Sequence, residues 1–224
     1  MKILVVEDNP DLSENIHNFL QKEGYVCELV GNFTDASDKI AAYEYDCIVL
    51  DIMLPDGNGL KLLEQIKSMN IKSGVVIISA KNSLDDKISG LEIGADDYLT
   101  KPFHLPELNA RLKAIYRRKN QGGDNVIIYR EIEVNTLTYI ARVHGVALDL
   151  TKKEFDLLLY FLTNKNHVLT RQSIAEHLWG DYTDNLANFD FVYQHVKNLR
   201  KKIHEAGGED YIGTVYGLGY RFNA

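Results

Sequence analysis

The sequence predicts an α/β fold for the first half of the chain, a five-stranded parallel sheet with helices on both faces, followed by a smaller α+β domain. Short apolar runs alternate with segments of helical length and periodicity, such as the one that carries Leu12, Ile16 and Phe19. Strands of a parallel sheet covered on both faces are typically continuous apolar runs. The five runs lie at Ile3–Val6, Tyr25–Val30, Cys47–Leu50, Val75–Ser79 and Tyr98–Leu99.

A polar segment with two adjacent glycines, residues 119–125, interrupts this alternation and is typical of a linker. The length of 224 residues also fits two domains of ordinary size. We therefore predict domains at residues 1–118 and 126–224. In the second domain, short strands are expected first, at Val126–Tyr129, Glu131–Val134, Tyr139–Val143 and Val146–Leu148.

Three helices and a hairpin are expected to complete the second domain. Thr151 and Glu154 have the spacing of a capping box, which indicates a helix start. A second helix is expected after Thr170 and a third over about residues 188–205. A glycine-punctuated hairpin is predicted at residues 212–222.

Composition limits the possible functions. The sequence contains no apolar stretch of about eighteen residues and no secretory signal pattern, so we expect a cytoplasmic protein without a membrane span. Cys27 and Cys47 lie in apolar segments and are expected to be buried thiols. The net charge is −7, and residues 120–224 carry 11 basic against 13 acidic groups. DNA binding by this half would therefore need locally concentrated positive charge.

Acidic side chains follow two of the predicted strands at the edge where parallel strands carry their sites. Glu7 and Asp8 come after the first strand and Asp51 after the third. Three carboxylates at one edge repel one another unless a divalent cation lies among them, and Mg²⁺ suits a set of oxygen ligands. Ser79 and Lys101 end the fourth and fifth strands.

Together these groups suit the transfer of a phosphoryl group to an aspartate. In such a reaction one carboxylate would be the nucleophile, Mg²⁺ and the lysine would neutralise phosphoryl oxygens, and the hydroxyl would donate a hydrogen bond. A single aspartate at a strand end is more often a turn residue than a nucleophile. The five groups in combination favour the chemical interpretation.

Three segments resemble the signatures of response-regulator receiver domains: residues 49–59 around Asp51, residues 77–80, and residues 94–103 around Lys101. The resemblance covers residues 1–118 and implies a flavodoxin-like (βα)5 fold. It implies that Asp51 is the phospho-acceptor and that Mg²⁺ is bound by Glu7, Asp8, Asp51 and the backbone carbonyl of Met53. Ser79 and Tyr98 match the switch pair of the family, and Lys101 matches its phosphate-contacting lysine.

The expected helix at residues 188–205 has one apolar face, made by Val192, Val196, Leu199 and Ile203. Polar and basic residues lie mainly away from that face and could read base edges or contact phosphates. On its own, such a segment is more often an ordinary solvated surface helix. The residues are Tyr193, Gln194, His195, Lys197, Asn198, Arg200, Lys201 and Lys202.

Residues 126–224 resemble the effector domain of the OmpR/PhoB family, with matches at residues 150–158, 169–171, 177–179, 199–203 and 217–222. The resemblance implies a winged helix-turn-helix in which residues 188–205 form the recognition helix. It adds Arg221 of the wing to the DNA contacts and implies that residues 178–187 contact RNA polymerase. Tyr216 stands where the family usually has a wing arginine, and the base-reading residues differ, so no target sequence is inferred.

The resemblance implies a phosphorylation-dependent transcriptional regulator rather than an enzyme. Its partners are then a sensor histidine kinase, promoter DNA, RNA polymerase and, when phosphorylated, a second copy of the chain. Receivers of this subfamily pair through the fourth helix, fifth strand and fifth helix. The residues expected in that interface are Lys87, Ile88, Leu91, Asp97, Glu107, Ala110 and Arg111.

Two other functions are compatible with parts of this pattern. A phosphatase of the haloacid dehalogenase type also uses an aspartate nucleophile, but it needs a second aspartate two residues later, where this chain has Met53. A regulator that binds DNA without phosphorylation would be expected to have lost one of the acidic, hydroxyl or lysine positions. None is lost here, although Glu7 replaces the aspartate often found there.

Overall fold

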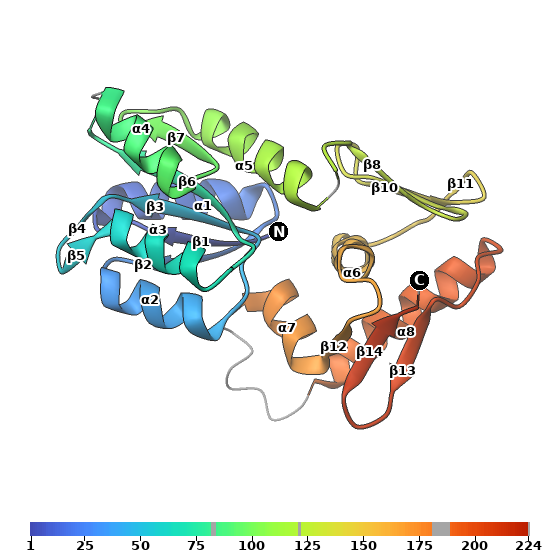
Figure 1. The fold of residues 1–224 in the computed structure, drawn as a ribbon. Helices are drawn as coiled ribbons and strands as arrows, with labels where there is room; N and C mark the ends of the chain where they lie inside the picture. Colours follow the sequence, from blue (N-terminus) through green and yellow to red (C-terminus); the bar gives the residue numbers. More distant parts are fainter. Residues whose placement is uncertain (82–83, 121, 181–188, 224) are drawn as a thin grey trace. The chain divides into compact units, whose positions relative to one another are not determined.

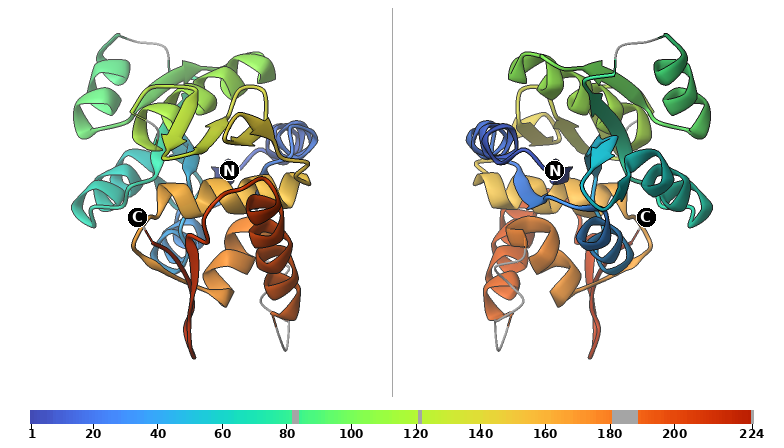
Figure 2. Two further views of the ribbon diagram at one scale, coloured as in Figure 1. Left: turned by 90° about the vertical axis from the view of Figure 1, so that its right-hand side faces the viewer. Right: turned by 90° about the vertical axis from the view of Figure 1, so that its left-hand side faces the viewer.

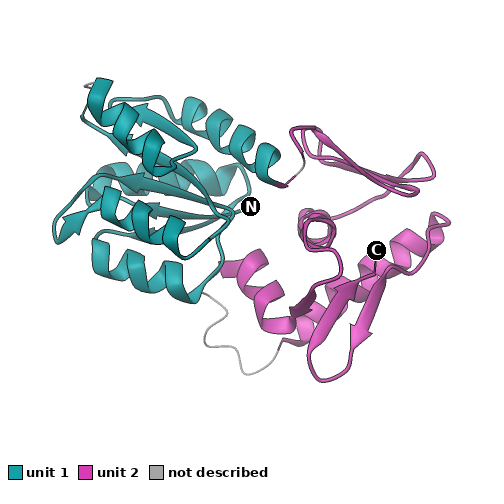
Figure 3. Cartoon of the chain, viewed as in Figure 1, with its two compact units in different colours: residues 1–119 teal, residues 120–224 magenta. Residues whose placement is uncertain are grey.

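The computed structural model describes residues 1–81, 84–120, 122–180 and 189–223 (Figure 1). The chain forms two compact units, residues 1–119 and 120–224 (Figure 3). The last helix of the first unit, α5 (Leu105–Asn120), includes the first two residues of the segment expected to be a linker. Lys119 is held to the first unit, because its ammonium lies 3.1 Å from a carboxylate oxygen of Asp96 and 3.0 Å from the carbonyl oxygen of Ser73.

The first unit is the predicted five-stranded parallel sheet, with the strand order β2-β1-β3-β6-β7. Alternate side chains of the central strands face opposite helix layers, so these strands are buried on both faces. The strands are β1 (Lys2–Val6), β2 (Val26–Val30), β3 (Cys47–Asp51), β6 (Gly74–Ser79) and β7 (Asp97–Thr100).

Two helix layers cover this sheet (Figure 1). Apolar residues of α2 (Phe33–Ala42) and α3 (Gly59–Ser68) pack into one core cluster with the strands, and Ile93 of α4 (Leu84–Ile93) packs against it. Helix α1 (Pro10–Lys22) is linked to α5 through Asn109, which donates to Glu23 at 2.7 Å and accepts from Tyr25 at 3.1 Å.

A short hairpin that the sequence did not reveal follows β3. Its strands are β4 (Met53–Leu54) and β5 (Gly57–Asn58). The chain then returns so closely that a Cβ atom at Gly59 would lie 2.0 Å from the carbonyl oxygen of Asp51. Only glycine fits this position, and the Gly59 N–H donates to the carbonyl of Ile52 at 2.8 Å.

The second unit has the predicted α+β winged-helix fold. It begins with an antiparallel sheet, order β11-β10-β9-β8, and ends with a three-stranded sheet, order β12-β14-β13. The short strand β12 (Val168–Thr170), which pairs with the hairpin, was not predicted. The other strands are β8 (Val126–Tyr129), β9 (Ile132–Asn135), β10 (Ile140–Val143), β11 (Val146–Ala147), β13 (Ile212–Val215) and β14 (Gly219–Phe222).

The helices of this unit are α6 (Lys152–Thr163), α7 (Arg171–Trp179) and α8 (Asp190–Glu205). The capping box at Thr151 and Glu154 is confirmed, and all four residues of the predicted apolar face of α8 are buried. The hairpin β13–β14 extends beside α8 (Figure 2). The expected start of α8 near residue 188, and residues 181–187 of the expected polymerase-contacting loop, lie outside the described residues.

The junction of the wing with β12 depends on a glycine. A Cβ atom at Gly219 would lie 2.1 Å from the carbonyl oxygen of Leu169. We expect Gly219→Ala to lower the free energy of unfolding of the second unit by about 2–3 kcal/mol, because β12 must move away from β14. The measurement is denaturant unfolding followed by the fluorescence of the single tryptophan, Trp179, which lies in this unit.

The matched control is Gly217→Ala, two residues away in the same hairpin. Gly217 has a φ of 76° but open space around its Cα atom. Its substitution should cost only about 1–2 kcal/mol of backbone strain. Equal losses in the free energy of unfolding for both variants would show that the close contact at Gly219 adds nothing to the cost of an alanine there.

Candidate functional site

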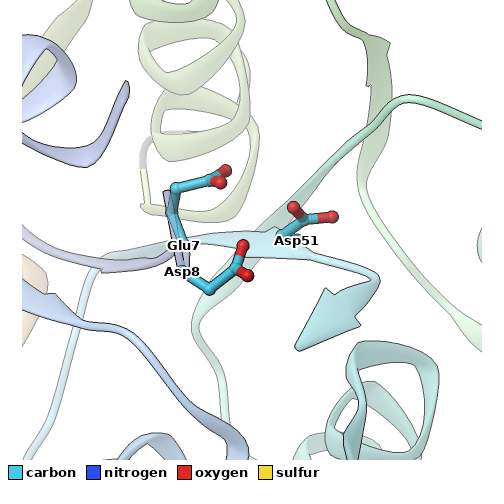
Figure 4. A group of neighbouring side chains, drawn as sticks. All are labelled: Glu7, Asp8 and Asp51. Carbon is cyan, nitrogen blue, oxygen red and sulfur yellow. The ribbon is translucent and has the colours of Figure 1, made fainter. Parts of the chain in front are cut away.

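Three carboxylates meet at the carboxyl edge of the sheet, as the sequence predicted. Asp51 ends β3, and Glu7 and Asp8 directly follow the neighbouring strand β1. One carboxylate oxygen from each residue lies within 4.8 Å of the other two (Figure 4). Glu7 and Asp51 are each only 2% exposed, whereas Asp8 is exposed. Buried carboxylates at this separation need a cation, and the donor set of oxygens alone is consistent with a metal site.

Lys101 supplies one positive charge to this cluster. Its ammonium nitrogen lies 2.6 Å from Oε2 of Glu7 and 2.6 Å from Oδ2 of Asp51. Burial lowers the pKa of Lys101, but its hydrogen bonds to Asp51 and Glu7 outweigh burial and leave the pKa raised. Burial also raises the pKa of Glu7 despite its contact with Lys101. One cation for three carboxylates leaves the edge net negative.

The remaining predicted residues of the receiver lie on the adjacent strands. Ser79 is fully buried at the end of β6, and its Oγ accepts a hydrogen bond from the N–H of Lys81 at 3.1 Å. The hydroxyl of Tyr98 on β7 donates to the carbonyl of Lys81 at 3.0 Å. Tyr98 is 9% exposed, and burial raises its pKa. Both side chains are therefore tied to one short segment after β6.

Asp56 is a functional candidate that the sequence did not single out. Its carboxylate, at the tip of the β4–β5 hairpin, accepts from the N–H of Phe33 at 2.6 Å and from the N–H and hydroxyl of Thr34 at 3.0 and 2.8 Å. These hydrogen bonds, that from Phe33 first, lower the pKa of Asp56. The hairpin that carries Met53 is thus fastened to the first turn of α2. Asp56 lies in the matched motif, but its partners are too distant in sequence to be recognised.

The residues predicted to contact DNA divide into two groups in the structure. His195 packs against Trp179, and burial lowers its pKa. The ammonium of Lys202 donates to Oε2 of Glu154 at 2.7 Å and to the carbonyl of Asp149 at 2.6 Å. Arg200 contacts the β13–β14 hairpin. The exposed group comprises Tyr193, Gln194, Lys197, Asn198, Lys201 and Arg221.

Some residues of the predicted dimer surface are exposed, whereas others form ion pairs within the same chain. Ile88 and Leu91 on α4 are 42% and 47% exposed, and Ala110 on α5 is exposed. Arg111, however, forms ion pairs of 2.7 Å with Asp97 and of 2.7 Å with Glu107 of the same chain. Asp97 and Arg111, both expected in the interface between two subunits, therefore pair with each other inside one chain.

Comparisons with known proteins agree with this fold. Residues 3–113 match the model of the response regulator receiver domain, and residues 145–222 match that of the transcriptional regulatory protein C-terminal domain. The transcriptional regulatory protein CiaR of Streptococcus pneumoniae is 39% identical over 223 residues, which cover 98% of this chain and 97% of CiaR. The response regulator ArlR of Staphylococcus saprophyticus is 40% identical over 219 residues, with coverages of 98% and 97%.

Solved structures give the same result for the first unit. A two-component response regulator from Clostridium difficile is 35% identical and covers 54% of this chain and 99% of its own, with a TM-score of 0.52. A Francisella response regulator receiver domain is 37% identical, with coverages of 52% and 97% and a TM-score of 0.51.

The fold and the acidic site therefore define a two-component response regulator with a DNA-binding output domain. The chain belongs to the OmpR/PhoB family of response regulators, which are transcription factors rather than enzymes. Such a regulator has kinase and DNA partners. In the part of the chain that the structure describes, every helix is too short or too polar to cross a membrane.

The buried charge of Glu7 suggests a conflict between stability and metal binding. Because its pKa is raised, the fold disfavours the ionised form, and this penalty acts above the folded-state pKa and disappears as the pH falls through it. In a chelator at neutral pH, Glu7→Gln should stabilise the first unit by about 1 kcal/mol in scanning calorimetry. The difference from wild type should shrink at acidic pH.

The same variant should bind Mg²⁺ about tenfold more weakly in isothermal titration calorimetry, since it loses one anionic ligand. Glu14→Gln, which neutralises an exposed carboxylate on α1 beyond its first turn, is the control and should leave both measurements unchanged. A Glu7→Gln protein that is less stable but binds Mg²⁺ normally would contradict this account of the site.

Proposed function

We propose that a sensor histidine kinase transfers a phosphoryl group to Asp51 of this regulator, and that the modification drives dimerisation and promoter binding in the cytoplasm. The observation that carries the proposal is the shared contact of Lys101 with Glu7 and Asp51 beside a third carboxylate. It supports the proposal, because a carboxylate that could act as nucleophile, a cation and oxygen atoms that could bind a metal lie at one edge of the sheet.

The donor set fits Mg²⁺, which would be held by Glu7, Asp8, Asp51 and the backbone carbonyl of Met53. When bound, Mg²⁺ supplies positive charge to the oxygens of the transferring phosphoryl group. Lys101 offers its ammonium to another of these oxygens, and Ser79 and Tyr98 respond from the neighbouring strands as the switch pair. The tether from Asp56 to α2 holds the hairpin that presents the Met53 carbonyl.

The phospho-acceptor is tested by incubating the protein with Mg²⁺ and a small phosphodonor such as phosphoramidate. Intact mass should show one added phosphoryl group that is stable to acid and labile to base. Asp51→Asn should remain unlabelled, and so should wild type in a chelator, because both the nucleophile and the metal are required. The control Asp38→Asn, an exposed position on α2, should be labelled normally. Undiminished labelling of Asp51→Asn would exclude Asp51 as the acceptor.

The exposed face of α8 supports the DNA-binding part of the proposal. Gln194 and Asn198 can read adenine edges, while Lys197 and Lys201 can contact phosphates or guanine. Tyr193 and Arg221 are exposed as well. Of the residues predicted to contact DNA, the exposed cations are Lys197, Lys201 and Arg221. So small a positive charge implies weak binding by one copy, and two linked copies on tandem half-sites would gain affinity through effective concentration. RNA polymerase would be contacted by residues 178–187, which lie largely outside the described residues.

Dimerisation would bury the exposed apolar residues of α4 and α5, namely Ile88, Leu91 and Ala110. Lys87 can pair with Glu107 across the interface, and Arg111 can exchange its intrachain contact with Asp97 for the same residue of the second copy. Exposed ion pairs are each worth only about 0–1 kcal/mol, so they set register more than affinity.

We expect Leu91→Asp to abolish phosphorylation-dependent association in sedimentation, because it places charge at the apolar centre of the interface. Binding to a DNA duplex with two half-sites, obtained by in vitro selection with wild type, should then lose its response to phosphorylation. Phosphorylation should raise the affinity of wild type about a hundredfold for two half-sites and should leave its affinity for one half-site unchanged. This is expected if phosphorylation acts only by linking two copies. The control Met69→Asp introduces the same charge at a residue that is 55% exposed on another face. Equal strengthening on one and two half-sites would contradict the dimer mechanism.

A further inference from the structure

Arg200 lies on the recognition helix, but its guanidinium contacts the wing hairpin. Its Nη2 donates to the carbonyl of Ile212 and, at 3.1 Å, to the hydroxyl of Thr214. Its Nε lies 3.6 Å from a carboxylate oxygen of Asp210, and its guanidinium carbon lies 5.7 Å from the centre of the Tyr220 ring. All four partners belong to the hairpin or to the segment that leads directly into it.

This contact uses the geometry of arginine as well as its charge. The side chain is only 27% exposed, and β13, which it meets, is an edge strand. The planar guanidinium presents several N–H groups in fixed directions, so one side chain satisfies a backbone carbonyl and a hydroxyl together. Both hydrogen bonds come from Nη2 at the end of the side chain, while Nε lies near Asp210 and the planar group lies over the Tyr220 ring. A lysine would keep the positive charge, but its shorter side chain and single ammonium nitrogen could not make all of these contacts together.

Whether the wing can contact DNA depends on the position of the β13–β14 hairpin relative to α8. Its tip carries Tyr216 and Leu218, which are 94% and 58% exposed, and no cation. Without long-range attraction to phosphates, such a tip depends on its position relative to α8 for any contact with a groove. Arg200 is a direct polar link between that helix and the hairpin.

We propose that Arg200 is a positioning residue: it fixes the wing against the recognition helix so that both reach one DNA half-site, and it does not itself contact DNA. The proposal rests on the proposed DNA-binding function. Lys201, the next residue, provides the contrast, because its side chain is 70% exposed and pairs with Glu205, at 3.6 Å, one turn away.

Charge-conserving substitution and salt dependence distinguish the two roles. If Arg200 contacts a phosphate, Arg200→Lys retains much of the affinity. Arg200→Ala then lowers the slope of log affinity against log salt by about 1.8 on the duplex with two half-sites, about 0.9 for each bound copy. If Arg200 positions the wing, lysine fails as alanine does. We expect both variants of the full-length phosphorylated protein to bind the selected duplex about tenfold more weakly than wild type, with an unchanged slope. Lys201→Ala should instead lower the slope by about 1.8, about 0.9 for each of the two bound copies.

Two further measurements separate positioning from a general loss of structure. Hydroxyl-radical footprinting of the Arg200→Lys complex at saturating protein should show lost protection where the wing lies and retained protection under the recognition helix. In the free protein, amide hydrogen exchange of Thr214 and Val215 should accelerate while exchange in α8 stays as in wild type. If the Arg200 variants fail to fold, Thr214→Val, which removes one acceptor, should give a smaller loss in the same footprint region.

Arg200→Lys with wild-type affinity and footprint, or Arg200→Ala with a reduced salt slope, would overturn the proposal in favour of a phosphate contact. Failure of the proposed function looks different, because in vitro selection with wild type would then yield no duplex that the phosphorylated protein binds more tightly than unselected DNA. A double-mutant cycle between Arg200→Lys and Thr214→Val should be non-additive, whereas additive losses would show that the two residues act independently.

Discussion

Glu7 and Asp51, two buried carboxylates on adjacent strands, share the single ammonium group of Lys101. Their mutual repulsion would otherwise be severe, since neither is screened by water. The strand order makes the contact possible, because Lys101 follows β7 at the sheet edge and reaches past β6 to β3 and β1. A bound group that draws the Lys101 ammonium away from Glu7 and Asp51 must supply positive charge to these two carboxylates in its place. The conformation of the receiver edge is therefore coupled to what binds there.

Much of this arrangement could be predicted because it follows from topology. Once residues 1–118 are assigned to a parallel sheet, Glu7, Asp8, Asp51, Ser79 and Lys101 must fall at one edge, and the structure places them there. The Asp56 tether could not be predicted, because its partners Phe33 and Thr34 lie 23 and 22 residues away and no periodic pattern connects them. The metal, the phosphoryl transfer and the dimer remain predictions.

In the second unit, helical periodicity correctly identified the buried face of α8 but not the reach of its long side chains. Arg200 and Lys202 lie off the apolar face, yet their cationic groups bend back to the hairpin and to the cap of α6. A pattern of residue types gives the direction of a Cα–Cβ bond, whereas a flexible side chain of several torsions can turn toward a partner that only the fold supplies. Positive charge in the sequence is thus not the same as positive charge available to DNA.

Helix α5 continues to Asn120, and Lys119 is anchored to Asp96 and to the carbonyl of Ser73. The segment that joins α5 to β8 is consequently short. From Asn120 to Val126, the first residue of β8, a fully stretched chain covers at most about 20 Å. Each output domain can therefore search only a small volume around its own receiver. In a symmetric pair of receivers, the length of this connecting segment would limit the distance between the two output domains on a duplex. It would also limit their relative orientation.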